Sequence, residues 1–378
     1  MSKIKDMLQV EFPLVAFSHC RDVVAAVSRA GGFGVLGATA FSPEQLELEL
    51  AWIDAHVDGK PYGLDVLIPE NMPLKAETAL TSQGLAARIP DTHRAFVRDL
   101  LASHGVELQA EAFSGRAGAP PPFWPEQGMK LLEVAFRHPI KLIANALGVP
   151  PPEMIAMGRA HGVPVAALAG AKDHALRLAA AGVDIIVAQG SEAGGHCGEV
   201  STLVLVPEVV RALKAAGHDC PVLAAGGIMT GRQMAGCMAM GAAGVWTGSV
   251  WLSTPESEVS DIFREKLVQA GSRDTVRSKG RTGKYARQLR SDWTQAWEHE
   301  DSPDALPMPM QSLISEPALK AVDQAAAAGN VEARKLVTYF VGQGVGLTTS
   351  VRSSRAVVND FMEEFAESVA EMSTWLDD

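Results

Sequence analysis

Eight short apolar runs, each followed by a segment of helical periodicity, constrain this 378-residue chain more than any other feature. The runs end in glycine, proline or polar residues, as strands of a buried sheet do. Such alternation is typical of a parallel sheet whose strands are joined by crossover helices. The candidate strands are residues 12–17, 33–38, 62–68, 141–147, 164–169, 183–188, 221–225 and 244–247.

The number of repeats separates two folds. A doubly wound open sheet also alternates strands with helices, but eight repeats with glycine-rich loops after the late strands favour a closed α/β barrel. We therefore predict a (β/α)8 TIM barrel formed by residues 1–252 plus 341–378, with an insertion after the third strand at about residues 69–128. Residues 253–340 are expected to form a smaller, mostly helical region that contributes to a substrate site or a lid.

Local signals place several helices and loops. Ser42-Pro43 is a good N-cap with proline at the first helical position, which predicts a helix running to about Val57. In the insertion, a helix is expected from Thr92 to Ser103, and the proline- and glycine-rich run of residues 114–125 is a loop that could act as a lid through Phe123 and Trp124.

The end of the chain, residues 353–378, is an acidic amphipathic pattern. Its apolar side consists of Phe361, Phe365, Val369 and Met372. This predicted helix could pack on its own barrel or on a second subunit, which leaves a homodimer open.

Composition and charge exclude several classes of protein. A net charge of −11 repels phosphate backbones, so nucleic acid is not expected as a partner. The four cysteines show neither a C-x-x-C pair nor zinc spacing, so they are expected to be reduced thiols without a metal. The N-terminus lacks the pattern of a signal peptide and no long apolar window follows, so we expect a cytoplasmic protein without a membrane partner.

Three glycine clusters follow the late strands and indicate a ligand site. The first, residues 188–198, contains His196 among four glycines, and the others are residues 224–228 and 244–249. Because glycine has no Cβ, the main chain can approach a flat ligand closely and offer its N–H groups as donors.

Two of these clusters predict a phosphate site. Gly226-Gly227 precedes a helix that begins near residue 231, so loop amides and the helix N-terminus could bind an anion, and Gly248-Ser249 would add further donors after the next strand. The alternative is that these glycines only allow tight turns and close packing.

The same clusters carry a resemblance to a known family. Residues 189–196, 225–228 and 248–249 together resemble the FMN-dependent nitronate monooxygenases, formerly called 2-nitropropane dioxygenases. Residues 25–34, the Gly-Gln-Gly turn at 342–346 and the basic stretch 280–287 are similar to that family as well. The resemblance implies oxidation of an alkyl nitronate by O2 to a carbonyl compound and nitrite, with neutral nitroalkanes as further candidate substrates.

The resemblance also implies roles for individual residues. Gly226, Gly227, Gly248 and Ser249 would hold the FMN phosphate, and His196 would face the substrate beside the flavin. The remaining cofactor contacts would come from Ala16, Asp65, Gln189, Gly194 and Gly195. Two positions depart from the family: Asp65 stands where many relatives have asparagine, and Phe17-Ser18-His19 replaces a frequent Pro-Met pair.

An imidazole suits this chemistry. His196 could stabilise a bound anion as a cation or an N–H donor, or remove the α-proton of a nitroalkane as a neutral base, because its ordinary pKa lies near working pH. The alternative is a structural role, in which His196 is a loop histidine bonded to a backbone carbonyl. Structural roles are favoured for Glu192 as a capping acceptor, for Cys197 and Trp246 in packing, and for His19 and His138 as surface or core histidines.

The basic run of residues 277–290 has three interpretations. A solvated helix face or a salt-bridge lattice comes first, a lid second, and a grip on an acidic carrier or a substrate phosphate third.

Three other functions compete with nitronate oxidation. An FMN-dependent enoyl-thioester reductase would share the barrel and the Gly-Gly-His loop but would need NAD(P)H and an acyl-carrier partner. A cofactor-free barrel acting on a sugar phosphate, as an isomerase or lyase, lacks the expected strand-end lysine or carboxylate pair. The third competing function is that of a flavoprotein that binds its ligand without catalysing a reaction.

Overall fold

Eight parallel strands close into a barrel in the computed structural model, as the strand count predicts. The structure describes residues 3–39, 41–69, 81–115 and 125–375. The barrel order is β1-β2-β3-β4-β5-β6-β8-β9, and β9 pairs with β1. The strands are β1 Leu14–Ser18, β2 Phe33–Gly37, β3 Tyr62–Val66, β4 Ile143–Asn145, β5 Val165–Ala169, β6 Ile185–Gln189, β8 Val222–Ala225 and β9 Gly244–Thr247.

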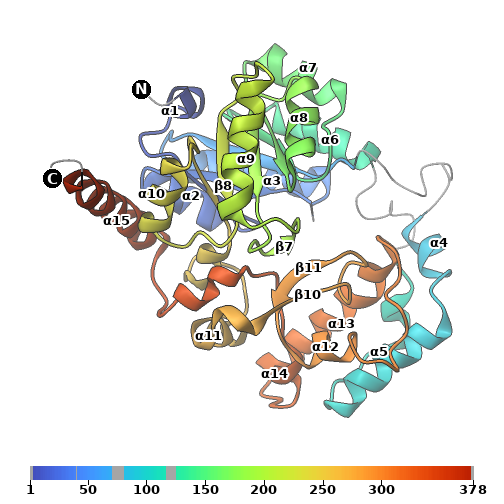
Figure 1. The fold of residues 1–378 in the computed structure, drawn as a ribbon. Helices are drawn as coiled ribbons and strands as arrows, with labels where there is room; N and C mark the ends of the chain where they lie inside the picture. The colour runs from blue at the N-terminus through green and yellow to red at the C-terminus, as the bar shows by residue number, and fades with distance from the viewer. Residues whose placement is uncertain (1–2, 40, 70–80, 116–124, 376–378) are drawn as a thin grey trace.

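Helices surround the barrel and follow its strands in turn (Figure 1). Ser42 and Gln45 form a reciprocal capping box at the start of α3, which confirms the predicted helix start. The barrel helices are α2 Arg21–Arg29, α3 Pro43–His56, α6 Pro125–Ala135, α7 Pro152–His161, α8 Lys172–Ala180, α9 Thr202–Ala215 and α10 Gly231–Ala239.

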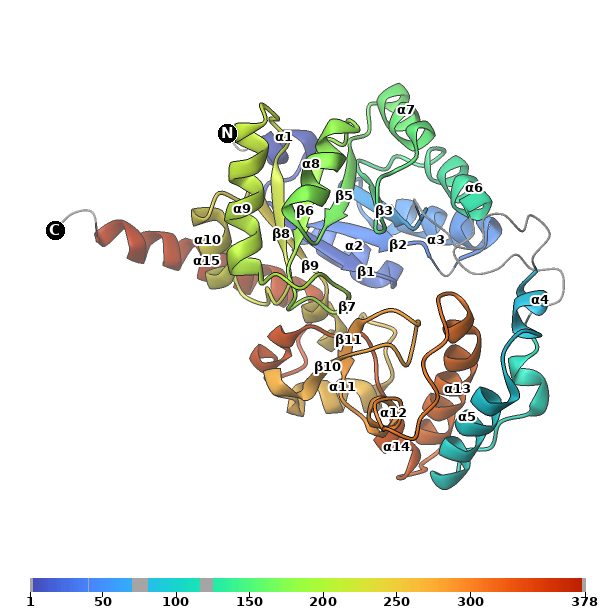
Figure 2. The ribbon, with the colours of Figure 1, turned by 45° about the vertical axis from the view of Figure 1, so that its right-hand side comes forward.

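The last barrel helix comes from the C-terminus. Helix α15, Ser354–Thr374, lies against α10 (Figures 1 and 2), and Phe361 on it is buried beside Trp251. The helix therefore packs on its own barrel. At the other end of the barrel, α1, Lys3–Leu8, buries Ile4 and Leu8 against the inward side chains of the strands.

A second core lies beyond the barrel mouth and draws on two distant parts of the chain (Figure 2). Val97, Leu101 and Phe113 of the insertion pack with residues such as Ile314 and Val322. The insertion thus contributes to this core. The domain limits expected from the sequence stay a prediction. The helices are α4 Ser82–Ala86, α5 Asp91–Ser103, α11 Asp261–Gln269, α12 Asp292–Ala296, α13 Met310–Ala327, α14 Ala333–Leu336 and the short 3-10 helices η1 Ala110–Phe113, η2 Ser249–Ser253, η3 Ser272–Asp274 and η4 Gln343–Leu347.

The predicted helix at Thr92–Ser103 is confirmed by α5. The lid residues Phe123 and Trp124 lie outside the described residues.

The basic run forms a hairpin, which contradicts the interpretation as a solvated helix face. Strands β10, Thr275–Ser278, and β11, Ala286–Leu289, pair antiparallel, and β11 also pairs with β7, Gly195–His196. Arg281, which is 7% exposed, binds Glu316 through two hydrogen bonds and lies over the rings of Tyr339 and Phe340. A salt-bridged hairpin at the barrel mouth therefore stands where a helix was expected. The sequence did not reveal this hairpin, because each of its strands is only four residues long and too polar to show a clear period.

Among the described residues, no helix combines the length and the apolar character needed to cross a bilayer.

Replacing Phe361 with alanine tests the docking of α15. The side chain is 1% exposed, so its loss should lower the free energy of unfolding by about 3–5 kcal/mol in urea titrations. Val369→Ala on the same helix, at a position 42% exposed, is the matched control and should change the free energy by less than about 0.5 kcal/mol. Equal effects of the two substitutions would contradict this packing.

Candidate active site

The three glycine loops leave the barrel at one level. Gln189 in β6 pairs with Ala225 in β8, and Ala225 pairs with Trp246 in β9. The loops that follow these strands therefore start side by side at the carboxyl end of the barrel, where TIM-barrel sites lie.

The Gly342–Gly344 turn, near the end of the chain, packs against all three glycine loops. A Cβ added to Gly194 would lie 2.9 Å from the amide nitrogen of Gly342, and one added to Gly344 would lie 2.6 Å from the carbonyl oxygen of Gly227. The Gly342 amide also donates to Ser249 Oγ at 2.8 Å. Only residues without a side chain allow this approach, so the Gly-Gln-Gly turn joins the first loop to the other two.

The glycine loops have backbone amides without hydrogen-bond partners, and two of their glycines border open space. Gly226 and Gly227 have φ of +114° and +70°. Within the described part of the chain, the amides of Gly226, Gly227 and Gly248 donate to no acceptor. A Cβ built on Gly248 would meet no atom within 4 Å, and the same is true of Gly195. At Gly248 a free amide therefore borders open space, as binding of an anionic group requires.

The N-terminus of α10 is already occupied. Glu364 of α15 accepts a hydrogen bond from the Gly231 amide at 2.9 Å, and Thr230 Oγ1 accepts one from the Gln233 amide. A carboxylate and a hydroxyl therefore take two of the helix-end donors that the sequence analysis offered to a phosphate, which leaves the loop amides as the main donors for one.

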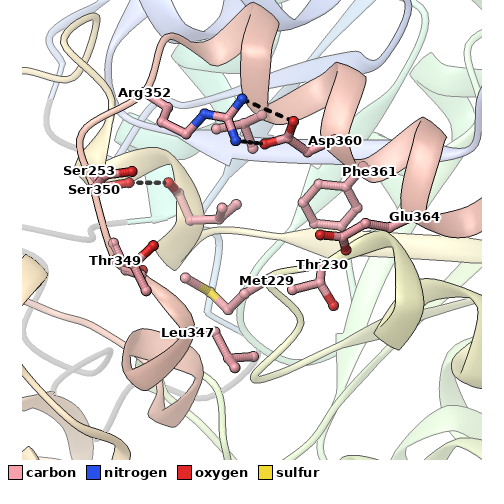
Figure 3. A pocket seen from close by; sticks show the side chains of 13 residues that line it. Met229, Thr230, Ser253, Leu347, Thr349, Ser350, Arg352, Asp360, Phe361 and Glu364 are labelled. Carbon is pink, nitrogen blue, oxygen red and sulfur yellow. Dashed lines mark hydrogen bonds and ion pairs between the residues drawn. The ribbon is translucent and has the colours of Figure 1, made fainter.

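A cavity of about 170 Å³ beside this helix end is acidic. Figure 3 shows that its arginine, Arg352, is paired with Asp360, while Glu364 lies beside Thr230. Because the arginine is neutralised and a second carboxylate remains, this cavity does not suit an anion.

His196 is anchored by the hairpin. Its Nε2 lies 2.8 Å from Thr282 Oγ1, and that hydroxyl donates to the carbonyl oxygen of Lys284 at 3.1 Å. Because the hydroxyl gives its one proton to the carbonyl, it accepts from His196, and Nε2 carries the imidazole proton. Nδ1 has no partner in the described residues and is not a buried atom, so it is open to a ligand.

The surroundings keep His196 neutral. Burial lowers its pKa, the positive charge of Lys284 lowers it further, and the resulting value is about 4. The imidazole is therefore uncharged at neutral pH. Sequence reasoning missed Thr282 as its anchor, although the basic stretch that contains Thr282 was singled out.

Asp65 is an uncharged acid inside the barrel mouth. Its strand neighbours Leu64 and Val66 belong to the core outside the barrel, so alternation directs Asp65 inward. The residue is 5% exposed, its Oδ1 has no partner within the described residues, and desolvation raises the pKa of the carboxyl to about 8. At neutral pH the group is protonated and can donate a hydrogen bond, as an asparagine amide would.

Ala16 lies beside the loop at Gly248, but its side chain points away from the barrel interior. It is fully buried, it pairs with Gly34 and Thr247 on the two neighbouring strands, and its side chain joins the core outside the barrel. The next residue, Phe17, packs against the inward-facing core instead. The side chain of Ala16 therefore does not face a ligand at the barrel mouth.

Four residues have the structural roles that the sequence analysis favoured for them. Glu192 accepts hydrogen bonds from the amide and hydroxyl of Thr202 at the start of α9, and Cys197 Sγ contacts the Ser191 carbonyl oxygen. His138 binds Asp54, and Trp246 is buried in the barrel interior.

His19 agrees with the expectation of a surface histidine with a bonded ring nitrogen. It is exposed, it follows the last residue of β1 at the barrel mouth, and its Nδ1 lies 3.0 Å from the carbonyl oxygen of Gly37. Desolvation nevertheless lowers its pKa.

Among the described residues, no group of three His, Cys, Asp or Glu side chains could hold a metal ion.

Comparison with known proteins identifies the chain's relatives. The sequence model of the nitronate monooxygenase family matches residues 2–364. A Mycobacterium tuberculosis protein with the name "Putative monooxygenase Rv1533" is 52% identical over 98% of both chains.

Two solved structures extend the likeness to the fold. The nitroalkane oxidase of Streptomyces ansochromogenes is 26% identical with a TM-score of 0.78, covering 97% of this chain and 99% of that one. FabK of Thermotoga maritima is 26% identical with a TM-score of 0.71 over 99% of both chains.

Stability measurements of the ligand-free protein across pH test the state of Asp65. The folded pKa of about 8 lies above the unfolded value of 3.8, so the folded chain holds a proton that the unfolded chain releases. The contribution is fully present below pH 3.8 and is lost as pH rises towards 8. Asp65→Asn should therefore become increasingly more stable than the parent protein between pH 5 and 8. A difference that does not change with pH would contradict a buried neutral carboxyl.

Proposed function

The chain belongs to the nitronate monooxygenase family, and we propose that it oxidises alkyl nitronates with O2, giving a carbonyl compound and nitrite, with FMN as its cofactor. Family membership implies a flavin. The observation that supports the proposal best is the open Nδ1 of a neutral, anchored His196 within the first glycine loop.

The residues at the mouth fit FMN. The free amides of Gly226, Gly227 and Gly248 would hold the phosphate, with Ser249 beside them. Gly195 has open space beside it, so the main chain of that loop would lie against the flat ring, near Gln189 and Gly194. Asp65, as a neutral acid, would donate to the ring without placing a charge beside it. When bound, the flavin supplies the electron transfer from the nitronate to O2.

His196 would act on the substrate as a neutral base. With Nε2 donating to Thr282 Oγ1, Nδ1 presents a lone pair, which can remove the α-proton of a neutral nitroalkane and so form the nitronate. The lowered pKa favours this neutral imidazole over the cation. The positive field of Lys284, which disfavours a charged imidazole, favours the substrate's negative charge at the same place.

Oxygen uptake and nitrite release with ethylnitronate test the function. The purified protein should be yellow and should consume O2 with this substrate, and His196→Asn should lower kcat/KM for nitroethane about 100-fold or more while the flavin stays bound. His174→Asn, at an exposed position on α8, is the matched control and should leave the rate unchanged.

The same preparation separates the competing functions. The likeness to FabK keeps an enoyl-thioester reductase as the second candidate, and rapid bleaching of the flavin by NADH without turnover of ethylnitronate would select it. A colourless protein would favour a cofactor-free barrel. An unchanged rate in His196→Asn would remove the histidine from the reaction, and a yellow protein inactive in both assays would leave a flavin-binding role alone.

Gly248→Leu tests the phosphate cradle. The residue has a φ of −132°, which side chains tolerate, and the added atoms would enter the open space. We expect unchanged urea unfolding of the ligand-free protein and an FMN affinity lowered about 100-fold, because the phosphate would lose charge-assisted bonds to the amides. Gly236→Ala on α10, also beside open space, is the control. Unaltered FMN binding in Gly248→Leu would place the phosphate elsewhere.

A further inference from the structure

The carboxyl group of Asp65 has one oxygen sealed inside the protein and one that a ligand can reach. Oδ1 is a buried atom without a hydrogen-bond partner in the described residues. Oδ2 has no partner there either, but it is not a buried atom. Because Asp65 is the last inward-facing residue of β3, this open oxygen lies towards the barrel mouth.

The strands on either side offer the carboxyl no hydrogen bond. Asp65 pairs with Gly37 in β2 and with Ala144 in β4, and neither residue has a polar side chain. Ala144 belongs to the core inside the barrel, and the ring of His19 fills the space beside Gly37. The group is therefore surrounded by apolar atoms and one imidazole, and only a ligand at the mouth could bind its open oxygen.

No charge on the side of His19 stabilises an ionised Asp65. Burial keeps the imidazole of His19 neutral, and the charges of Arg281 and Glu258 that act on it oppose each other. Desolvation is the one cause that shifts the pKa of Asp65, so neither of these charges contributes there.

The other titratable group of the site is uncharged as well. His196 is neutral above its pKa of about 4, and Lys284, which acts on His196, does not shift the pKa of Asp65. An ionised carboxylate without a cation or a donor is unfavourable in an apolar interior. Asp65 therefore keeps its proton until the solution becomes alkaline.

The proton changes what Asp65 can bind. A protonated carboxyl donates through its O–H and accepts through its C=O, as an asparagine amide donates and accepts. The ring of a flavin has carbonyl oxygens and ring nitrogens that accept hydrogen bonds. An ionised Asp65 would lose the donor and would place a negative charge against these acceptors.

We propose that Asp65 binds the flavin ring only in its protonated form, so that cofactor binding requires one proton and weakens in alkaline solution. The inference rests on the cofactor part of the proposed function, because it requires a flavin at the barrel mouth. It does not depend on the oxidation of a nitronate.

The linkage between proton and flavin sets the size of the effect. In the ligand-free protein the pKa of Asp65 is about 8, so the carboxyl is mostly protonated at pH 7 and mostly ionised at pH 9. If only the protonated form binds, the affinity for FMN is level below this pKa and falls about tenfold between pH 7 and pH 9.

Release of FMN from the yellow protein tests the proposal. Ultrafiltration at a series of pH values from 7 to 9, with free FMN measured by fluorescence, gives the Kd at each pH. Phosphate esters complete their second ionisation near pH ~6, so the charge of FMN is almost constant in this range. We expect the Kd of the parent protein to rise about tenfold and that of Asp65→Asn to change less than about twofold.

Asp58→Asn is the matched control. Asp58 is exposed and has a φ of +54°, which asparagine tolerates, so this variant should keep the tenfold change of the parent protein. Lys266 also titrates in this range, because burial lowers its pKa to about 8. Its ammonium binds the carbonyl oxygens of Arg334 and Val337 in both variants, so it cannot produce a difference between them.

A second measurement follows the proton directly. Calorimetric titration of the flavin-free protein with FMN, in two buffers of different ionisation enthalpy, gives the number of protons taken up. We expect about one proton per flavin at pH 9 and about a tenth of a proton at pH 7. Asp65→Asn should take up none at either pH. If this variant fails to fold, proton uptake by the parent protein decides alone.

The outcomes separate this inference from the proposed function. Equal pH dependence in the parent protein and Asp65→Asn would overturn it, and so would a parent Kd that is the same at pH 7 and pH 9. Oxidation of ethylnitronate by a protein with such a constant Kd would leave the proposed function standing alone. Proton-linked FMN binding without oxidation of ethylnitronate would leave only the role of Asp65, and a protein that binds no FMN would overturn both.

Discussion

Close backbone contact between the glycine loops and the Gly342–Gly344 turn is the constraint on which the site depends. Gly194 meets Gly342, and Gly344 meets the carbonyl of Gly227, at distances that exclude any side chain. The same turn donates to Ser249. The Gly342–Gly344 turn also connects the second core to α15. Its contact with the glycine loops therefore fixes these loops to the segment that leads from the second core back to the barrel. His196, one residue beyond Gly195, is thereby held between the barrel and the hairpin.

Sequence patterns predicted the barrel well because its information is local. Each strand is a short apolar run ended by a breaker, and Ser42 with Gln45 marks a helix start within four residues. The second core carries no such signal. It joins the insertion, through residues such as Phe113, to residues some 200 positions later, such as Ile314, and neither segment reveals its partner by periodicity. The hairpin was missed for a related reason, since Arg281 and Arg287 are buried only because distant partners neutralise or accept from them.

The candidate site was predictable in position and less so in chemical state. Gly226, Gly227, Gly248 and His196 could be singled out by residue type and spacing, and the structure brings their loops to one end of the barrel. Residue type cannot show that Asp65 lacks a partner or that Glu364 caps α10, because both depend on tertiary surroundings. The exposed position of His19 likewise needs Gly37, on the neighbouring strand, to leave room for the ring.

Desolvation gives the mouth a common electrostatic character. It is the largest cause of the pKa shifts of His19, Asp65 and His196, and it holds each group in its uncharged form at neutral pH. An acidic protein would otherwise repel an anion, so a site whose own acid is protonated and which lies near the positive charge of Lys284 suits a negatively charged substrate. Neutral imidazoles can also move a proton without first releasing one to solvent. The same burial that costs folding energy at Asp65 therefore removes a negative charge that would repel the anion.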